Sequence, residues 1–185
     1  MTKFGHFVTS AGFSVLAYRL LAGDDPQLGI LETLDWFAAA GASGDMSDPP
    51  LTGLAMACAS GLIFGASAPD QMEFPLFGRL IGRVSLLPHR TVTHSPWLWI
   101  AFICGGVIAL AQTQGWGLLF AYQWLGFSLS GALHIFVDMG SMSGIPLLNP
   151  FGGRYSLCLY STGGVRELGY SLGIGIGAAL LGWLL

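Results

Sequence analysis

The sequence predicts an all-α integral membrane protein, a bundle of about five transmembrane helices whose N-terminus is cytoplasmic. Three observations support this fold class: a composition too apolar for water, apolar stretches of the right length, and basic residues confined to one side. Of the 185 residues, 53% are hydrophobic and 9% are charged, whereas a soluble domain carries roughly 25% charged residues. We therefore expect one membrane domain, residues 1–185, embedded in a lipid bilayer.

The expected spans follow from the apolar stretches, because a helix needs about 20 mostly apolar residues to cross a bilayer. The stretches cover residues 4–21, 51–68, 97–111, 116–137 and 168–185. The third is at the short limit for a span. The first has an alternative interpretation as a signal peptide, since Lys3 precedes it. No small-residue cleavage site lies before Asp24, however, and Arg19 lies near its end, which argues against cleavage.

Charge sets the predicted topology. The polar loop 24–50 is acidic and contains no Lys or Arg, so it is expected on the non-cytoplasmic side. Its centre, residues 28–37, has a mixed helical spacing that suits a segment along the membrane interface. The basic residues fall on the cytoplasmic side, as the positive-inside rule requires: Lys3, Arg79, Arg83, Arg90, Arg154 and Arg166. Topology accounts for these few basic residues, so no nucleic-acid binding is expected.

Small residues at every fourth position predict tight contacts between helices. In the second span they are Gly53, Ala57, Gly61 and Gly65, and in the last span Gly169, Gly173 and Gly177. Such seams explain packing within one bundle and also permit a homo-oligomer. The three cysteines form no CxxC motif, and buried thiols behave as small apolar residues, so we expect them to pack.

All four histidines lie beside a predicted span end on the cytoplasmic side, and two carboxylates accompany them. The set is His6, His89, His94, His134, Asp70 and Asp138. His134 and Asp138 are four residues apart, so on a helix both side chains point the same way and can share one ion. Imidazole and carboxylate together suit zinc or a similar divalent ion. The pattern therefore predicts a metal site with one or two ions.

Several of these groups also have a structural interpretation. His6 alone could be an interfacial anchor, and the His134–Asp138 pair alone could be a structural hydrogen bond. Arg90 could clamp an anion beside the metal or anchor its loop at the lipid headgroups. Ser95 and Thr93 could support the histidines or cap the helix that starts at Pro96. Ionisable groups inside membrane segments are costly and usually functional, which favours a shared polar site.

The same residues resemble a known family. The resemblance covers residues 4 to 155 in four blocks: Gly5-His6-Phe7; Ala68-Pro69-Asp70; His89-Arg90-Thr91-Val92-Thr93-His94-Ser95; and His134-x3-Asp138 followed by Gly144-Ile145-Pro146-Leu147-Leu148 and Pro150. The chain resembles the YdjM-like group, which is described as LexA-binding, inner-membrane-associated and, by inference, metal-dependent hydrolases. No motif for LexA contact is present, so that partner is not carried over.

The resemblance implies a hydrolase of the bacterial inner membrane, with its metal held by His6, Asp70, His89, His94, His134 and Asp138. Two positions depart from the family pattern. Met72 replaces the second acid of the family's Pro-Asp-x-Asp motif, and a thioether cannot replace a hard oxygen ligand. Glu73 is one position further on and could substitute. Thr91 replaces a glycine but leaves the ligand spacing intact.

These observations predict hydrolysis of an ester or phosphoester by a metal-activated water at the cytoplasmic face. Arg90 is the expected stabiliser of negative charge and Glu73 the expected general base. Because the site lies at headgroup depth, a lipid or lipid-linked phosphate is the expected substrate. The alternative is a non-catalytic membrane protein that uses the metal for structure or partner docking. A metal carrier is disfavoured, since the fourth and fifth spans have no acidic residue at mid-bilayer.

Overall fold

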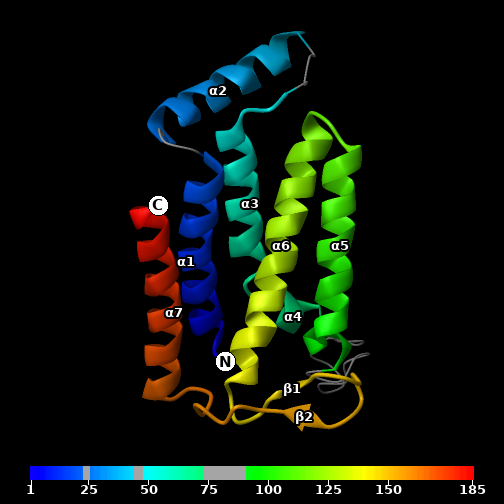
Figure 1. Ribbon diagram of the computed structural model, residues 1–185, viewed down its shortest axis with the longest axis vertical. Coiled ribbons are helices and arrows are strands. Elements are labelled where there is room, and N and C mark those ends of the chain that lie inside the picture. The colour runs from blue at the N-terminus through cyan, green and yellow to red at the C-terminus, as the bar shows by residue number, and fades with distance from the viewer. Residues whose placement is uncertain (23–25, 44–47, 73–90) are drawn as a thin grey trace, which may run out of the picture.

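The computed structural model describes residues 1–22, 26–43, 48–72 and 91–185. Within them the chain forms seven α-helices, one short 3₁₀ helix and a two-stranded antiparallel hairpin (Figure 1). The elements are α1 (Lys3–Ala22), α2 (Pro26–Ser43), α3 (Leu51–Gly65), α4 (Ala68–Gln71), η2 (Val92–His94), α5 (Pro96–Gln112), α6 (Trp116–Met139), β1 (Ile145–Pro146), β2 (Arg154–Tyr155) and α7 (Val165–Leu184).

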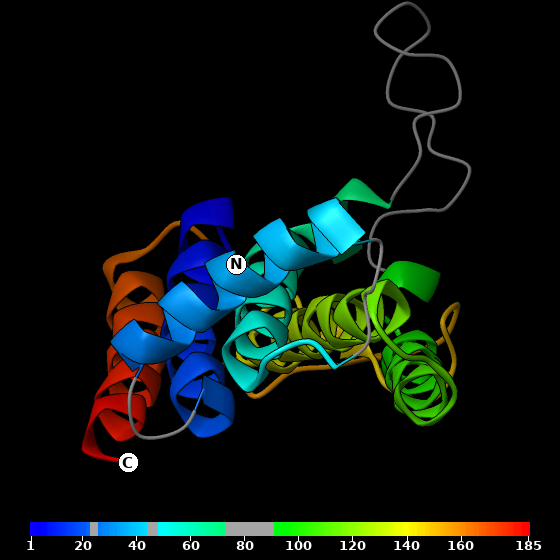
Figure 2. The same ribbon diagram turned by 90° about the horizontal axis from the view of Figure 1, so that it is seen from above.

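The five long helices α1, α3, α5, α6 and α7 stand side by side in a curved row (Figures 1 and 2). α1 packs between α7 and α3, and α6 packs between α3 and α5. α2 lies across one end of the row, whereas the β1–β2 hairpin lies at the opposite end (Figure 1). In the hairpin, Ile145 pairs with Tyr155 and Pro146 with Arg154.

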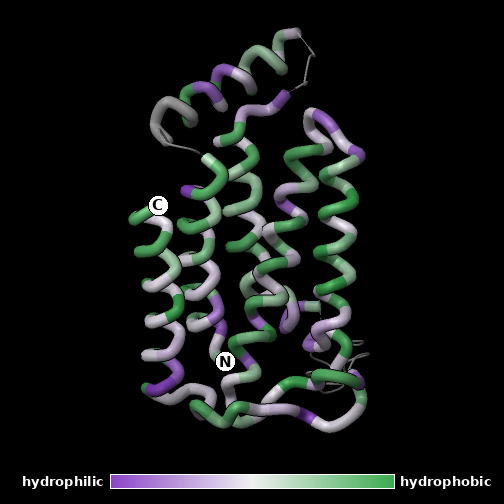
Figure 3. The backbone as a smooth tube through the Cα atoms, in the orientation of Figure 1, coloured by the Kyte–Doolittle hydropathy of each residue, from purple (hydrophilic) through white to green (hydrophobic). Residues whose placement is uncertain are grey.

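The prediction of an α-helical membrane protein agrees with this arrangement, because each of the five apolar stretches contains one long helix. Hydrophobic residues predominate along these helices (Figure 3). Among the described residues, only α7 has both the length and the hydropathy of a membrane-crossing helix, while α3 and α5 are apolar but shorter. That five helices cross the membrane therefore stays a prediction. The centre of the acidic loop, expected to have helical spacing, lies within α2.

Glycines bring the helices of the row into close contact. A Cβ atom on Gly61 would lie 2.1 Å from the carbonyl oxygen of Gln123, so α3 and α6 meet backbone to backbone there. A Cβ on Gly12 of α1 would lie 1.9 Å from the carbonyl oxygen of Gly175 on α7. Such contacts leave room for hydrogen alone, as is common between membrane helices. The seam predicted for the second span is confirmed at Gly61.

As a contact within the bundle, the seam predicted for the last span is not formed among the described residues, and its use in a homo-oligomer stays a prediction. A Cβ on any of Gly169, Gly173 or Gly177 would meet nothing within 4 Å among the described residues. α7 instead turns its buried face, which includes Glu167, Ser171 and Gly175, toward α1. The orientation follows from polar groups, since Glu167 is buried against the start of α1 and could not face lipid without a partner.

Most of the described basic residues lie at one end of the fold, and Arg19, in the last turn of α1, lies toward the other. Among the described residues, Lys3, Arg154 and Arg166 lie at the end that carries the hairpin. The acidic residues of α2, Glu32 and Asp35, lie at the other end (Figure 1). This separation follows the asymmetry predicted from the sequence. The hairpin end is also where α1 begins, α6 ends, and α4 and η2 lie, so four segments meet there (Figure 1).

Candidate metal centre

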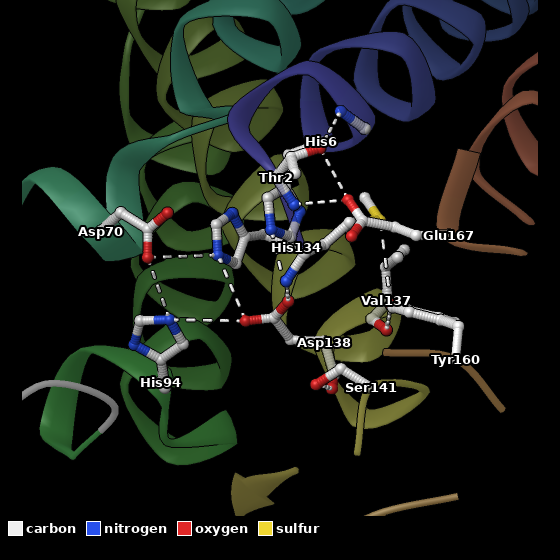
Figure 4. Close-up of polar contacts among 12 residues, drawn as sticks. Thr2, His6, Asp70, His94, His134, Val137, Asp138, Ser141, Tyr160 and Glu167 are labelled. Carbon is white, nitrogen blue, oxygen red and sulfur yellow. Dashed lines mark hydrogen bonds and ion pairs between the residues drawn. The ribbon is translucent and has the colours of Figure 1, made fainter. Parts of the chain in front are cut away.

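Three segments supply four side chains to one cluster at the hairpin end of the bundle (Figure 4). Asp70 comes from α4, His94 from the end of η2, and both His134 and Asp138 from the last turns of α6. The i, i+4 spacing on α6 puts the last two on one helix face. On α4, Pro69 occupies the first turn, a position where its missing N–H costs nothing.

The four side chains form a compact set of two nitrogens and two oxygens. His94 Nε2 lies 3.4 Å from Asp70 Oδ1 and 3.7 Å from Asp138 Oδ2. His134 Nε2 lies 3.8 Å from each of the same two oxygens. Both imidazoles and Asp138 are almost fully buried, whereas the side chain of Asp70 is 23% exposed. The cluster is thus open to its surroundings chiefly at Asp70.

A hydrogen bond fixes the protonation of the His134 ring. Its Nδ1 lies 2.8 Å from the carbonyl oxygen of Ala66, and a carbonyl can only accept, so Nδ1 carries the proton. In the neutral ring Nε2 then holds a lone pair, and it has no hydrogen-bond partner among the described residues. That lone pair faces two carboxylate oxygens, Asp70 Oδ1 and Asp138 Oδ2. A proton on Nε2 or a bound cation would compensate these three electron-rich atoms.

The spacing fits a divalent ion of ordinary size. Ligand atoms about 2.0–2.2 Å from a tetrahedral zinc ion lie about 3.3–3.6 Å apart. The four nitrogen–oxygen distances in this set run from 3.4 to 3.8 Å, and the ligand atoms of Asp70, His94 and His134 all lie within 4.8 Å of one another. Two imidazole nitrogens and two carboxylate oxygens form a donor set that zinc accepts.

His6 reaches the cluster from α1. Its ring stacks on the ring of His134, with centroids 3.4 Å apart and planes 6° from parallel. His6 Nε2 lies 3.3 Å from Asp138 Oδ1, and the Met1 nitrogen contacts the same oxygen. Asp138 therefore faces different partners with its two oxygens, α1 through Oδ1 and the two other histidines through Oδ2 (Figure 4).

Similarity to a known protein family covers all the segments that build this cluster. The sequence model of the YdjM inner membrane protein family matches residues 1–182, nearly the whole chain. The chain belongs to the YdjM inner membrane protein family. It matches none of the curated proteins and none of the solved structures. Family membership confirms the localisation predicted from the sequence, the inner membrane.

Of the six ligands that the YdjM resemblance implies, the structure brings five together: His6, Asp70, His94, His134 and Asp138. The remaining ligand, His89, lies outside the described residues, as do the two predicted catalytic residues, Arg90 and Glu73. Thr93 supports His94 as predicted, since its Oγ1 lies 3.2 Å from His94 Nδ1. Ser95 makes no side-chain cap bond to α5, and its hydroxyl has no hydrogen-bond partner in the described part of the chain, so neither alternative holds for Ser95.

Met72 stands where the family pattern has its second acid, and its surroundings in the structure are also apolar. Met72 follows α4 and packs against the hydrophobic cluster of Ala68, Trp99, Ile135 and Ile145. It belongs to the apolar core beside the site. Any second ion that the family's extra acid would hold lacks that ligand here.

Electrostatics keep the exposed member of the cluster charged. Burial raises the pKa of the Asp70 carboxyl, but the hydrogen bond with His94 and the charges of His134, His94 and His6 lower it further, to about 2. Asp70 is therefore an anion at neutral pH. An ionised carboxylate is the form that binds a metal.

Sequence reasoning missed two features of this YdjM site. Glu167, buried at the start of α7, accepts hydrogen bonds from the backbone N–H and the hydroxyl of Thr2, at 2.5 and 2.6 Å. It ties the segment before His6 to α7. An acidic residue at the edge of an apolar stretch was the available signal. The hydrogen bond between His134 and the Ala66 carbonyl could not be predicted from the sequence, because every residue has the same backbone acceptor.

Proposed function

We propose that this protein is a membrane-embedded metal-dependent hydrolase that acts on an ester or phosphoester at the cytoplasmic face. One divalent ion, with zinc the best fit to the donors, is held by Asp70, His94, His134 and Asp138. The observation that supports the proposal most directly concerns His134 Nε2. This atom has no hydrogen-bond partner among the described residues and faces two carboxylate oxygens at 3.8 Å inside a buried cluster. His89 stays a predicted further ligand.

When bound, such an ion supplies Lewis acidity and lowers the pKa of a coordinated water to about 7. The protein residues then have separate tasks. Buried His94 and Asp138 keep bulk water from one side of the ion, and the partly exposed Asp70 marks the side where a substrate enters. In this proposal Arg90 stabilises negative charge on the substrate, and Glu73 receives the proton.

A lipid or lipid-linked phosphate is the proposed substrate class. All five long helices cross the bilayer in this proposal, which puts the cluster at headgroup depth. An apolar groove of approximately 470 Å³ lies between α1, α3 and α6, lined by residues such as Phe13, Leu62 and Phe136. Phe13 lies two helical turns from His6, about 10 Å along α1. The groove is thus within reach of an acyl chain whose headgroup lies at the cluster.

Groove filling tests this substrate class. Ala17 lines the groove, so Ala17→Phe should raise the KM for a long-chain ester or phosphoester and leave a short-chain analogue unchanged. Val107→Phe, at an exposed position of α5, is the matched control. Equal KM values for both chain lengths in the Ala17→Phe protein would contradict a bound acyl chain.

The function itself is tested by metal content and turnover together. Elemental mass spectrometry of the detergent-purified protein should find one equivalent of zinc, lost in His134→Ala. The zinc-loaded protein should release phosphate or fatty acid from a bacterial lipid extract, and the chelated protein should not. No bound metal in the wild type, and none after zinc is added, would overturn the proposal.

One observation favours the non-catalytic alternative. Met72 removes an oxygen ligand that the family pattern has, and its side chain belongs to the apolar core. A metal kept for structure or docking needs no open coordination position. In that case zinc would be present at one equivalent and its removal would lower the thermal stability, but no lipid extract would yield product.

A further inference from the structure

We propose that His6 is a positioning residue of the metal centre rather than one of its ligands. His6 holds Asp138 Oδ1, so that Asp138 Oδ2 points at the ion beside His94 and His134. This inference rests on the proposed metal site. It assigns to His6 a task different from the ligand role that the family resemblance implies.

The first argument is the division of Asp138. His6 Nε2 lies 3.3 Å from Oδ1, whereas the His94 and His134 Nε2 atoms lie 3.7 and 3.8 Å from Oδ2. The two oxygens of one carboxylate thus have different partners. Oδ2 faces the same two histidine nitrogens that Asp70 Oδ1 faces, and none of these four side chains comes from α1.

The second argument is the stacking of two rings. A nitrogen lone pair of imidazole lies in the ring plane. The His6 and His134 planes are 6° from parallel with centroids 3.4 Å apart, so their in-plane lone pairs run beside each other and do not meet at a point. One ion in line with the His134 lone pair is therefore out of line for His6.

A second ion on the α1 side would have too few ligands. Ligand atoms of His6, His134 and Asp138 do lie within 4.8 Å of one another. The neutral His134 ring, however, has one lone pair and can bind one ion. With His134 engaged beside His94, a second ion would keep only His6 and Asp138 Oδ1 among the described residues, and Met72 supplies no oxygen.

The role of His6 matches how metal sites are generally supported. Ligating carboxylates are held by groups outside the ligand set, and loss of such a group costs 10–100-fold in metal affinity. The contact of His6 Nε2 with Oδ1 is an ion-pair contact at 3.3 Å, and neither ring nitrogen of His6 makes a hydrogen bond of good geometry within the described residues. Its position is fixed in turn by Thr2, which Glu167 holds through two hydrogen bonds.

Counting imidazoles around zinc tests the inference. X-ray absorption of the zinc-loaded wild type and of His6→Gln should give the same number of imidazole ligands, whereas His94→Gln should have one fewer. Zinc competition should show a 10–100-fold weaker Kd for His6→Ala and a smaller loss for His6→Gln, whose amide can donate to Oδ1.

The outcomes separate the two proposals. A loss of one imidazole in His6→Gln, equal to that in His94→Gln, would make His6 a ligand and overturn this inference while the metal site stands. An unchanged Kd in His6→Ala would also overturn it. If the wild type takes up no zinc, the proposed function and this inference are both overturned. If His6→Ala does not fold, His6→Gln still decides, since it keeps a polar side chain of similar reach.

Discussion

The two ends of the helix row treat acidic residues in opposite ways. At the α2 end, Glu32 and Asp35 are exposed and need no partner from the bundle. At the hairpin end, Asp138 and Glu167 are almost completely buried, and each contacts groups from another helix. Burying a carboxylate is costly unless charge and hydrogen bonds compensate. The acids of the α2 end are thus solvated, whereas those of the hairpin end depend on partners within the fold.

The largest expected effect is the loss of zinc and of hydrolysis when an acid at the hairpin end, rather than at the α2 end, is neutralised. Asp138→Asn removes the charge that balances the cluster, so we expect zinc below 0.1 equivalent, an order-of-magnitude figure for a lost ligand. Hydrolysis should fall more than about 100-fold, beyond the loss for a supporting residue. Asp35→Asn at the α2 end should match the wild type in both measurements. Equal zinc in the two variants would remove the distinction between the ends.

Metal removal should destabilise the wild type and leave the site variant unchanged. At a free zinc concentration about 1,000 times the Kd, binding stabilises the folded state by about 4 kcal/mol, which raises the Tm by roughly 10 °C. A chelator should therefore lower the Tm of the wild type by that amount. The Tm of Asp138→Asn should not respond. A response of equal size in both would place the metal elsewhere.

Acid titration of the metal-free protein tests how much the Asp70 carboxylate at the hairpin end contributes to stability. The folded-state pKa of Asp70, about 2, lies below its ordinary value of 3.8. Its carboxylate therefore contributes stability that is complete above about pH 4 and is lost as the pH falls through 2. The difference in unfolding free energy between wild type and Asp70→Asn should be constant from pH 7 to 4 and then shrink, by urea denaturation. Exposed Glu32→Gln should show no such difference.

The smallest expected effect concerns the support of α1. Glu167→Gln keeps the size of the side chain but removes the charge that accepts both Thr2 bonds. We expect zinc affinity to fall several-fold, less than in His6→Ala, because the tie is one step further from the ion. Zinc competition measures this affinity, and Glu32→Gln is the control. A larger loss than in His6→Ala would mean that Glu167 acts on the site by another route.

The sequence predicted the site more closely than the packing around it. The pair His134 and Asp138 follows from helical spacing, and the proximity of Asp70 and His94 from their placement at one membrane face. Which oxygen of Asp138 faces which histidine could not be predicted, because it depends on where α1 and α6 cross. The glycines of α7 misled for a similar reason. Gly169, Gly173 and Gly177 repeat regularly, but buried Glu167 turns a different face inward.

The hydrogen bond from His134 to Ala66 has a mechanical consequence. Ala66 is the residue that ends α3, and His134 belongs to α6. The ring belongs to α6 and is hydrogen-bonded to the end of α3, so sliding of α3 along α6 would turn the ring or break this bond. The same two helices meet backbone to backbone at Gly61, where an added Cβ would lie 2.1 Å from the carbonyl oxygen of Gln123. A larger residue at Gly61 would push α3 and α6 apart and so disturb the hydrogen bond that orients His134.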